Sequence, residues 1–277
     1  MTLSRMIDRI RGFLGHKFPP LGGWAFRFCY RAFPNPCPVE LFPGIRVDLK
    51  TTDDTQKATY WQGERFEWPT CPLLERYCRP PVTRFFDIGS NYGFFSYFLL
   101  SRFPHLQVAA FEPNPETFEK LRKTRERNGL ARLDPQPMGI SDFEGEKHLY
   151  RGESDSGHST FFRHPELPEK TAGAIPIRRF DRWLESRGIS LPSSPEWVAK
   201  IDVEGSECGV LRGMTTALQK KAFALLVVEL NDFTLGLAGD TVADVRKLLT
   251  DHGYREIFPA ELGYRRPKTA NAFFVPA

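Results

Sequence analysis

The chain lacks an apolar run long enough to cross a bilayer. Its longest apolar stretches, residues 94–100 and 222–228, fall far short of the roughly 20 residues that a membrane-spanning helix needs. Near the N-terminus, the charged side chains of Arg5, Asp8 and Arg9 interrupt every stretch that could form the apolar centre of a secretory signal. We therefore expect a cytoplasmic protein with no membrane-spanning helix.

Cysteine is scarce, and its spacing does not match the common zinc motifs. The 277 residues include five cysteines, an odd number, with no CxxC pair and no histidine at zinc-finger spacing. This pattern is typical of reduced thiols that pack as small apolar side chains. The expected free thiols are Cys29, Cys37, Cys71, Cys78 and Cys208.

Charge of one sign is not in large excess either, since 38 Lys and Arg residues face 34 Asp and Glu residues. This balance, without a basic patch interleaved with aromatic residues, argues against nucleic-acid binding. Positive charge is nevertheless concentrated in residues 1–33, where six cationic side chains face Asp8 alone. Apolar residues recur there at helical spacing: Met6, Ile7, Ile10, Phe13 and Leu14. Two interpretations stay open, a peripheral contact with an anionic membrane, or packing on the domain or on a second copy in a homo-oligomer.

Prolines divide the chain near its first third. No helix can run through residues 34–43, which hold four prolines, or through the pair Pro80-Pro81. We predict an N-terminal cap or lid with helical and strand segments over residues 1–80, and a main domain over residues 81–277.

Aromatic residues gather in the second half of the predicted cap, at Tyr60, Trp61, Phe66 and Trp68. They either cover a ligand cleft, where a sugar could stack on their rings, or pack in the core.

From residue 82 onward, short apolar runs alternate with segments of helical periodicity. This alternation predicts an α/β fold with a mostly parallel sheet, helices on both faces and an antiparallel C-terminal strand. The predicted strands cover residues 84–88, 107–111, 137–141, 146–150, 175–179, 197–202, 222–229, 254–258 and 272–275, and the predicted helices cover residues 93–102, 115–128, 180–185, 207–219 and 241–252. Ligands of such sheets bind at the carboxyl ends of the strands.

The first strand of this series runs into a glycine-containing turn, Asp87-Ile88-Gly89-Ser90-Asn91-Tyr92-Gly93. Its spacing, D-x-G-x-x-x-G, differs from the G-x-G-x-x-G that places a pyrophosphate on a helix N-terminus. An acid at the strand end repels a pyrophosphate and attracts a ligand that carries a cationic amino group. The alternative to a ligand-binding turn is an ordinary strand-to-helix turn with no ligand.

Two more acids follow strands at matching positions. Glu112 lies 19 residues after Gly93, where a carboxylate can accept both hydroxyls of a ribose. Asp142 follows the next strand and suits the exocyclic amine of an adenine. Together, the three strand ends describe S-adenosylmethionine better than NAD.

At these residues the chain resembles the FkbM family of S-adenosylmethionine-dependent methyltransferases. The resemblance covers roughly residues 82–230 and is carried by residues 87–93, 111–114, 139–142, 178–184 and, most specifically, the run Lys-Ile-Asp-Val-Glu-Gly-Ser-Glu at 200–207. It implies a Rossmann-like class I methyltransferase sheet, S-adenosylmethionine as cofactor, and O-methylation of a hydroxyl on a sugar, polyketide or similar small molecule.

The resemblance also implies which residues hold the cofactor. Asp87, Gly89, Asn91 and Gly93 would hold its methionine end, Glu112 its ribose and Asp142 its adenine. The other implied cofactor-binding positions are Ser90, Pro113, Asn114, Ser141 and Asp202.

Candidate catalytic residues follow the buried strand 197–202. Methyl transfer needs in-line attack by an oxygen, so a base need only take the proton of the hydroxyl. Asp202 and Glu204 are candidates, although Lys200 could pair with either, and Glu204 could instead cap the next helix. His158, in a polar loop, is a third candidate base or an exposed loop residue. Glu229, at the next strand end, is a weaker acceptor-binding candidate.

Two other functions stay open, an NAD-dependent oxidoreductase and a nucleotide-binding protein without catalysis. The absent third glycine and the acid at Asp87 oppose the first, and the full set of strand-end acids opposes the second. We expect no metal, because no acid and Asn cluster accompanies the strand-end acids as in catechol-type sites.

Overall fold

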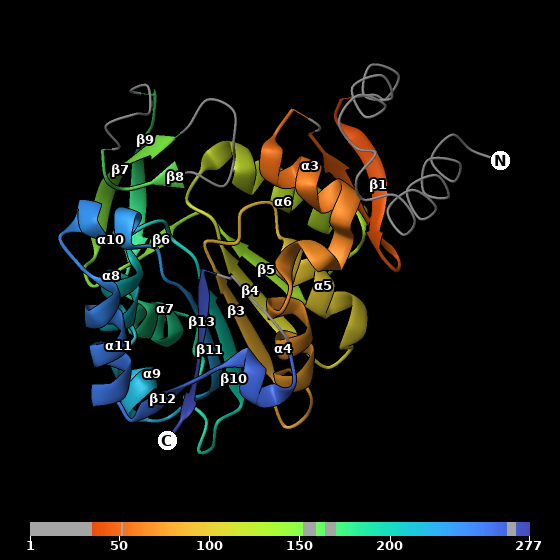
Figure 1. Cartoon of the computed structure of the whole chain (residues 1–277). Coiled ribbons are helices and arrows are strands. Elements are labelled where there is room, and N and C mark those ends of the chain that lie inside the picture. The colour runs from red at the N-terminus through yellow and green to blue at the C-terminus, as the bar shows by residue number, and fades with distance from the viewer. Residues whose placement is uncertain (1–34, 51, 152–158, 164–169, 265–269) are drawn as a thin grey trace.

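A seven-stranded sheet forms the centre of the protein (Figure 1). The computed structural model describes residues 35–50, 52–151, 159–163, 170–264 and 270–277. The strands lie in the order β12 (Tyr254–Ile257), β13 (Asn271–Pro276), β11 (Phe223–Glu229), β10 (Trp197–Ile201), β3 (Arg84–Ile88), β4 (Gln107–Phe111) and β5 (Leu133–Gln136). All neighbouring pairs are parallel except those of β13, which is antiparallel to β11 and β12. The predicted Rossmann-like, mostly parallel sheet with an antiparallel C-terminal strand is confirmed.

Helices cover both faces of this sheet because successive side chains in its strands alternate between two apolar cores (Figure 1). In β3, Phe85 packs in the core under one layer of helices, while Phe86 packs in the opposite core. The first layer contains α4 (Thr70–Tyr77), α5 (Phe94–Arg102) and α6 (Pro115–Arg127), and the second contains α7 (Phe180–Ser186), α8 (Glu207–Gly213), α9 (Thr215–Gln219) and α11 (Val242–Asp251). Asp87 and Lys200 therefore lie on the α5 side of the sheet, like Phe85 and Val198.

The described part of the predicted cap packs on α5 and α6 and contributes α4 to the first helix layer. It consists of β1 (Cys37–Phe42), β2 (Ile45–Leu49), α3 (Asp54–Gln62), the 3-10 helix η1 (Gly63–Glu67) and α4. Its apolar side chains belong to the same buried cluster as β3 and α5; for example, the ring of Phe42 lies 5.4 Å from that of Phe94. Part of the proline-rich stretch forms β1, a strand that was not expected from the sequence. Its proline is tolerated because both strands of a two-stranded hairpin are edge strands.

Three of the predicted strands form a separate small sheet instead of joining the central one. It consists of β6 (Gly139–Ile140), β9 (Lys170–Arg178), β7 (Gly145–Arg151) and β8 (Ser159–Thr160), in that order. Strand β8 forms hydrogen bonds with the loops that follow β4 and β10 of the central sheet. Asn114 Nδ2 donates to Ser159 Oγ at 3.1 Å, and Thr160 Oγ1 donates to the carbonyl of Glu204 at 2.8 Å.

Further elements depart from the sequence prediction. Helix 207–219 is divided at Met214 into α8 and α9, and α10 (Asp232–Ala238) and the 3-10 helix η2 (Pro259–Leu262) were not expected. The described cysteines are buried free thiols: Cys37, Cys71, Cys78 and Cys208. Within the described part of the chain, no helix has the length and apolar character needed to cross a membrane. The basic stretch 1–33 and Cys29 lie outside the described residues.

Candidate active site

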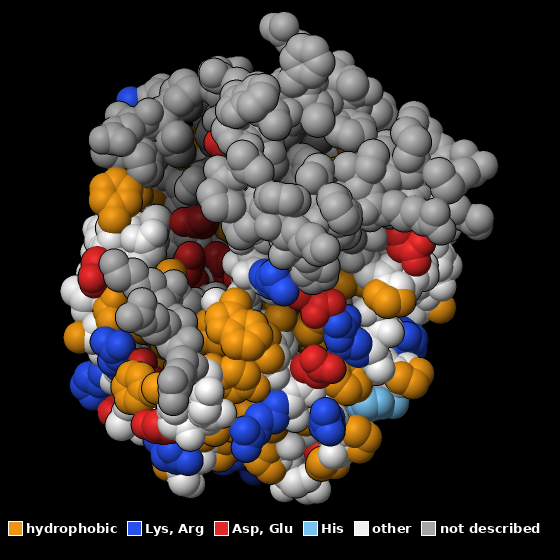
Figure 2. Space-filling model, turned by 45° about the vertical axis from the view of Figure 1, so that its right-hand side comes forward, with side chains coloured by type: hydrophobic (Ala, Val, Ile, Leu, Met, Phe, Trp, Pro, Cys, Tyr) orange, Lys and Arg blue, Asp and Glu red, His pale blue; other side chains and the backbone are white. Residues whose placement is uncertain are grey.

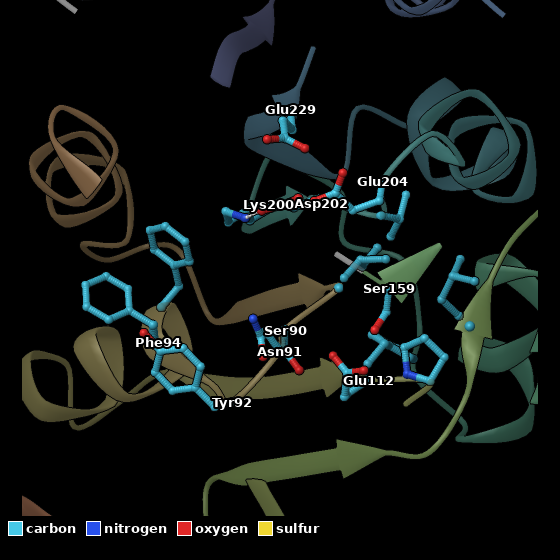
Figure 3. Close-up of a pocket in the computed structure, with 18 of the residues that line it drawn as sticks. Ser90, Asn91, Tyr92, Phe94, Glu112, Ser159, Lys200, Asp202, Glu204 and Glu229 are labelled. Atoms are coloured by element: carbon cyan, nitrogen blue, oxygen red, sulfur yellow. Dashed lines mark hydrogen bonds and ion pairs between the residues drawn. The ribbon is translucent and has the colours of Figure 1, made fainter. Parts of the chain in front are cut away.

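A cavity opens at the carboxyl ends of β3, β4, β10 and β11, the edge where parallel sheets bind ligands. Figure 2 shows acidic side chains at the floor of this hollow, and Figure 3 shows two groups of polar side chains facing each other across it. The lining residues are Thr55, Phe66, Glu67, Ile88, Gly89, Ser90, Asn91, Tyr92, Phe94, Phe95, Phe111, Glu112, Pro113, Met138, Gly139, Ile140, Ser159, Phe161, Lys200, Asp202, Val203, Glu204 and Glu229.

The turn after β3 packs against the loop after β10 without room for a side chain. Gly89 has φ +80°, and a Cβ placed on it would lie 1.7 Å from the carbonyl oxygen of Asp202. The Asp202 N–H in turn donates to the carbonyl of Ile88 at 3.0 Å. The absence of a side chain at Gly89 therefore allows the turn after β3 and the loop after β10 to lie in contact.

Asp87 lies behind this turn and does not line the cavity. It is 1% exposed, and its Oδ2 accepts hydrogen bonds from the Ser96 N–H at 3.1 Å and Oγ at 2.6 Å. Burial raises the pKa of this carboxyl, while nearby Lys200 and the bonds from Ser96 oppose the rise. Asp87 thus fixes the start of α5, and its contact with the methionine end of a cofactor stays a prediction.

Ser90 and Asn91 carry buried polar atoms that point to a ligand. The Oγ of Ser90, a residue only 5% exposed, and the Oδ1 of Asn91 are buried without a hydrogen-bond partner among the described residues. Buried polar groups in proteins are nearly always paired. Both residues line the cavity (Figure 3), so a bound polar group could complete their hydrogen bonds.

Glu112 lies beside them at the end of β4, also in the wall of the cavity. Its carboxylate accepts hydrogen bonds from the N–H groups of Asn114, at 2.8 Å, and Asn91. Burial raises the pKa of Glu112 to about 7, although these N–H groups oppose the rise. Pro113 also lines the cavity, and Asn114 caps α6 and donates a hydrogen bond to Ser159. Their contacts with a cofactor stay predictions.

Near β6, where the sequence predicted that Asp142 would contact adenine, the side chains that line the cavity are apolar. Met138, Ile140 and Phe161 line the cavity, but Ser141 and Asp142 do not. Ser141 packs closely on α8, where a Cβ on Gly213 would lie 2.0 Å from its carbonyl oxygen. Contacts of Ser141 and Asp142 with a cofactor stay predictions. The apolar lining was missed because only the polar residues after each strand were considered.

Lys200 is a buried cation next to the candidate catalytic acids. Its side chain is 3% exposed, its Nζ lies 2.5 Å from Asp202 Oδ2, and it lies 4.7 Å from the centre of the Phe95 ring. Burial opposes its charge, but Asp202, Glu67 and Asp87 together outweigh this effect and raise the pKa of Lys200. Of the two acids proposed as its partner, Asp202 forms this ion pair.

Three carboxylates meet beside this ion pair, since Asp202, Glu204 and Glu229 each bring an oxygen within 4.8 Å of the others. The negative charge of Asp202, together with burial and Glu204, raises the pKa of Glu229 to about 10. Protonation of Glu229 is therefore favoured, and its side chain hydrogen-bonds to Asp202. Hard divalent cations also favour such carboxylate groups, so metal independence stays a prediction.

The loop that carries Glu204 is held by a neighbouring acid. Glu207 is 1% exposed and accepts hydrogen bonds from the N–H groups of Val203 and Gly205, both at 3.1 Å. Burial raises the pKa of Glu207 to about 7, against the effect of these bonds. Glu204 itself lines the cavity with its backbone at φ +48°.

Glu67 is a cavity residue that sequence reasoning missed. It lies at the end of η1, where burial raises its pKa to about 7, with Lys200 opposing and Asp202 adding to the rise. Its neighbour Phe66 also lines the cavity, as one of the two interpretations of the aromatic stretch expects, whereas Tyr60 is buried in the core. The aromatic composition pointed to this segment but not to its acid. His158 lies outside the described residues.

Comparisons with known proteins identify the region that carries the site. The family model described as "Methyltransferase FkbM domain" matches residues 87–256. The hexuronic acid methyltransferase AglP of Haloferax volcanii is 33% identical over 172 residues, 60% of this chain and 60% of that protein. Methyltransferase 1 of Beauveria bassiana is 25% identical over 145 residues, 46% of this chain and 57% of that protein. The chain thus matches somewhat more than half the length of each.

Among solved structures, precorrin-6y C5,15-methyltransferase from Geobacter metallireducens aligns with a TM-score of 0.42 and 11% identity, over 77% of this chain and 87% of that one.

Proposed function

Because the chain belongs to the FkbM methyltransferase family, we propose that it is an S-adenosylmethionine-dependent O-methyltransferase whose acceptor is a hydroxyl of a small molecule, foremost a sugar. One observation carries this proposal: the cavity joins unpaired buried polar atoms of Ser90 and Asn91 to a carboxylate cluster on the facing strand ends. The relative AglP is a hexuronic acid methyltransferase, which supports a sugar acceptor.

The residues of the first group fit the parts of S-adenosylmethionine. Ser90 Oγ and Asn91 Oδ1 would bond the polar methionine end, and Glu112 would accept the ribose hydroxyls. The apolar side chains of Met138 and Ile140 would contact the adenine. When bound, this cofactor supplies a methyl group made electrophilic by its sulfonium.

The residues of the second group would hold and deprotonate the acceptor. The ion pair with Lys200 and the hydrogen bond from Glu229 fix Asp202, which suits it to orient a hydroxyl. Glu204, on the loop held by Glu207, would take the proton of that hydroxyl as the oxygen attacks. Because methyl transfer needs in-line geometry, orientation of the acceptor hydroxyl by these residues contributes to the rate alongside proton removal.

Substitution of Asp202 by Asn and of Glu204 by Gln tests these roles. Each should lower kcat by about 100-fold or more, while the Kd for S-adenosylmethionine changes by less than about threefold, because cofactor contacts are proposed for the other group. Turnover is followed as transfer of labelled methyl to a panel of simple glycosides, and Kd by calorimetry.

The matched control is Glu146→Gln, at an exposed glutamate on β7, which should leave both quantities unchanged. Equal losses of turnover and cofactor affinity in the Asp202 or Glu204 variant would assign that residue to cofactor binding instead.

A further inference from the structure

The acceptor side of the cavity is acidic. Glu67, Asp202, Glu204 and Glu229 line it, and Lys200 is the cation among the described lining residues. Figure 3 shows Lys200, Asp202, Glu204 and Glu229 side by side at the ends of β10 and β11. Four carboxyl groups thus face one cation on this side of the cavity.

Lys200 is poorly placed to receive an acidic acceptor. Its ammonium is paired with Asp202 at 2.5 Å, its side chain is 3% exposed, and Phe95 lies over it. A carboxylate entering the cavity would meet like charges, and such repulsion is stronger in a partly buried site than in bulk water. A hydroxyl, by contrast, can donate a hydrogen bond to each of these acids.

One wall of this pocket comes from outside the family-matched segment. Phe66 and Glu67 lie on η1, whereas the match to the family model begins at residue 87. They bring an apolar ring and a hydrogen-bond acceptor to the cavity, the combination that typically orients a ligand in a pocket. The N-terminal segment therefore contributes this pair to the site, ahead of the residues that the family model matches.

We infer that the site selects an uncharged, polyhydroxylated acceptor over a uronic acid, and that Glu67 and Phe66 are specificity-determining residues. The inference rests on the proposed function. Because Asp202 and Glu204 belong to the run that carries the family resemblance, any difference from AglP, which is named for a hexuronic acid, rests on Phe66 and Glu67.

Matched acceptor pairs test the inference. The methyl glycosides of glucose, galactose and mannose are compared with the corresponding methyl uronosides, which differ by a carboxylate at C6. The full-length protein should show kcat/KM at least tenfold higher for the neutral member of the best pair. Equal or higher values for the uronoside, or no turnover of any neutral glycoside by a protein that binds S-adenosylmethionine, would overturn the inference. Absence of S-adenosylmethionine binding would instead overturn the proposed function.

Glu67→Gln, assayed at pH 8, then tests the specificity role, because it removes the charge that Glu67 carries above its pKa of about 7 and keeps the shape. The ratio of kcat/KM for neutral to acidic acceptor should fall by about threefold to tenfold, mainly through better use of the uronoside. The control Glu261→Gln, at an exposed glutamate that does not line the cavity, should leave the ratio unchanged. If Glu67→Gln unfolds, Phe66→Leu should raise KM for the neutral glycoside with little change in cofactor Kd. An unchanged ratio in a folded Glu67→Gln protein, or an unchanged KM in Phe66→Leu, would contradict the assignment.

Discussion

Gly89→Ala should destabilise the protein far more than Gly44→Ala, although the two glycines have nearly the same backbone conformation. Their φ angles are +80° and +76°, so each substitution forces alanine into the left-handed region at a cost of about 1 to 2 kcal/mol. At Gly44 no other atom lies within 4 Å of an added Cβ, whereas at Gly89 the Asp202 carbonyl oxygen lies 1.7 Å away. The additional loss at Gly89 is expected to exceed about 3 kcal/mol, because two backbone segments must separate.

Unfolding in urea measures the loss of stability in each variant, and calorimetry measures the affinity of each folded variant for S-adenosylmethionine. Gly44→Ala should keep wild-type affinity for S-adenosylmethionine, while any folded Gly89→Ala protein should bind it at least tenfold more weakly. Similar free energies of unfolding for the two variants would show that the close approach of the two loops is not needed for stability.

Lys200→Met should produce the second large effect, a loss of about 3 to 5 kcal/mol in the free energy of unfolding at pH 8. Methionine fills the space of the lysine stem but leaves Asp202, Glu67 and Asp87 without the positive charge that now faces them. Lys220→Met, at an exposed lysine, is the matched control and should change stability by less than about 0.5 kcal/mol.

The pH dependence separates this charge effect from packing. Without Lys200, the pKa values of Glu67 and Asp87, already raised by burial, should rise further. An acid whose pKa is higher in the folded than in the unfolded protein favours folding below its unfolded pKa and loses that contribution as pH rises through its folded pKa. The deficit of Lys200→Met should therefore be largest at pH 8 and shrink toward pH 5. A deficit of equal size at both values would contradict the charge account.

The alternating pattern predicted the central sheet well because its strands are short, apolar and bounded by turn residues. The turn Asp87–Gly93 and the run after β10 also pointed to the correct edge of the sheet. By contrast, β5 was missed because Pro135 lies inside it, and proline is accommodated there at the edge of the sheet.

The arrangement within the site depends on contacts that sequence spacing does not contain. Lys200 and Asp87 are neighbours because β10 and β3 pair in the register that aligns them. Glu67 approaches them only because the N-terminal segment packs on the same face, through a core shared with α5. Asp142 was predicted from its place after a strand, yet that strand belongs to the small sheet. Strand ends thus indicated the edge, while register and tertiary packing decided which side chains meet.

The central claim is that the cavity is built for S-adenosylmethionine, and calorimetric titration of the purified protein tests it most directly. Parallel titrations use S-adenosylmethionine, S-adenosylhomocysteine and NAD. We expect the two adenosyl ligands to bind with micromolar Kd and NAD not to bind, with both affinities reduced in Ser90→Ala. Absence of binding by both adenosyl ligands, in a protein shown to be folded by circular dichroism, would contradict the account.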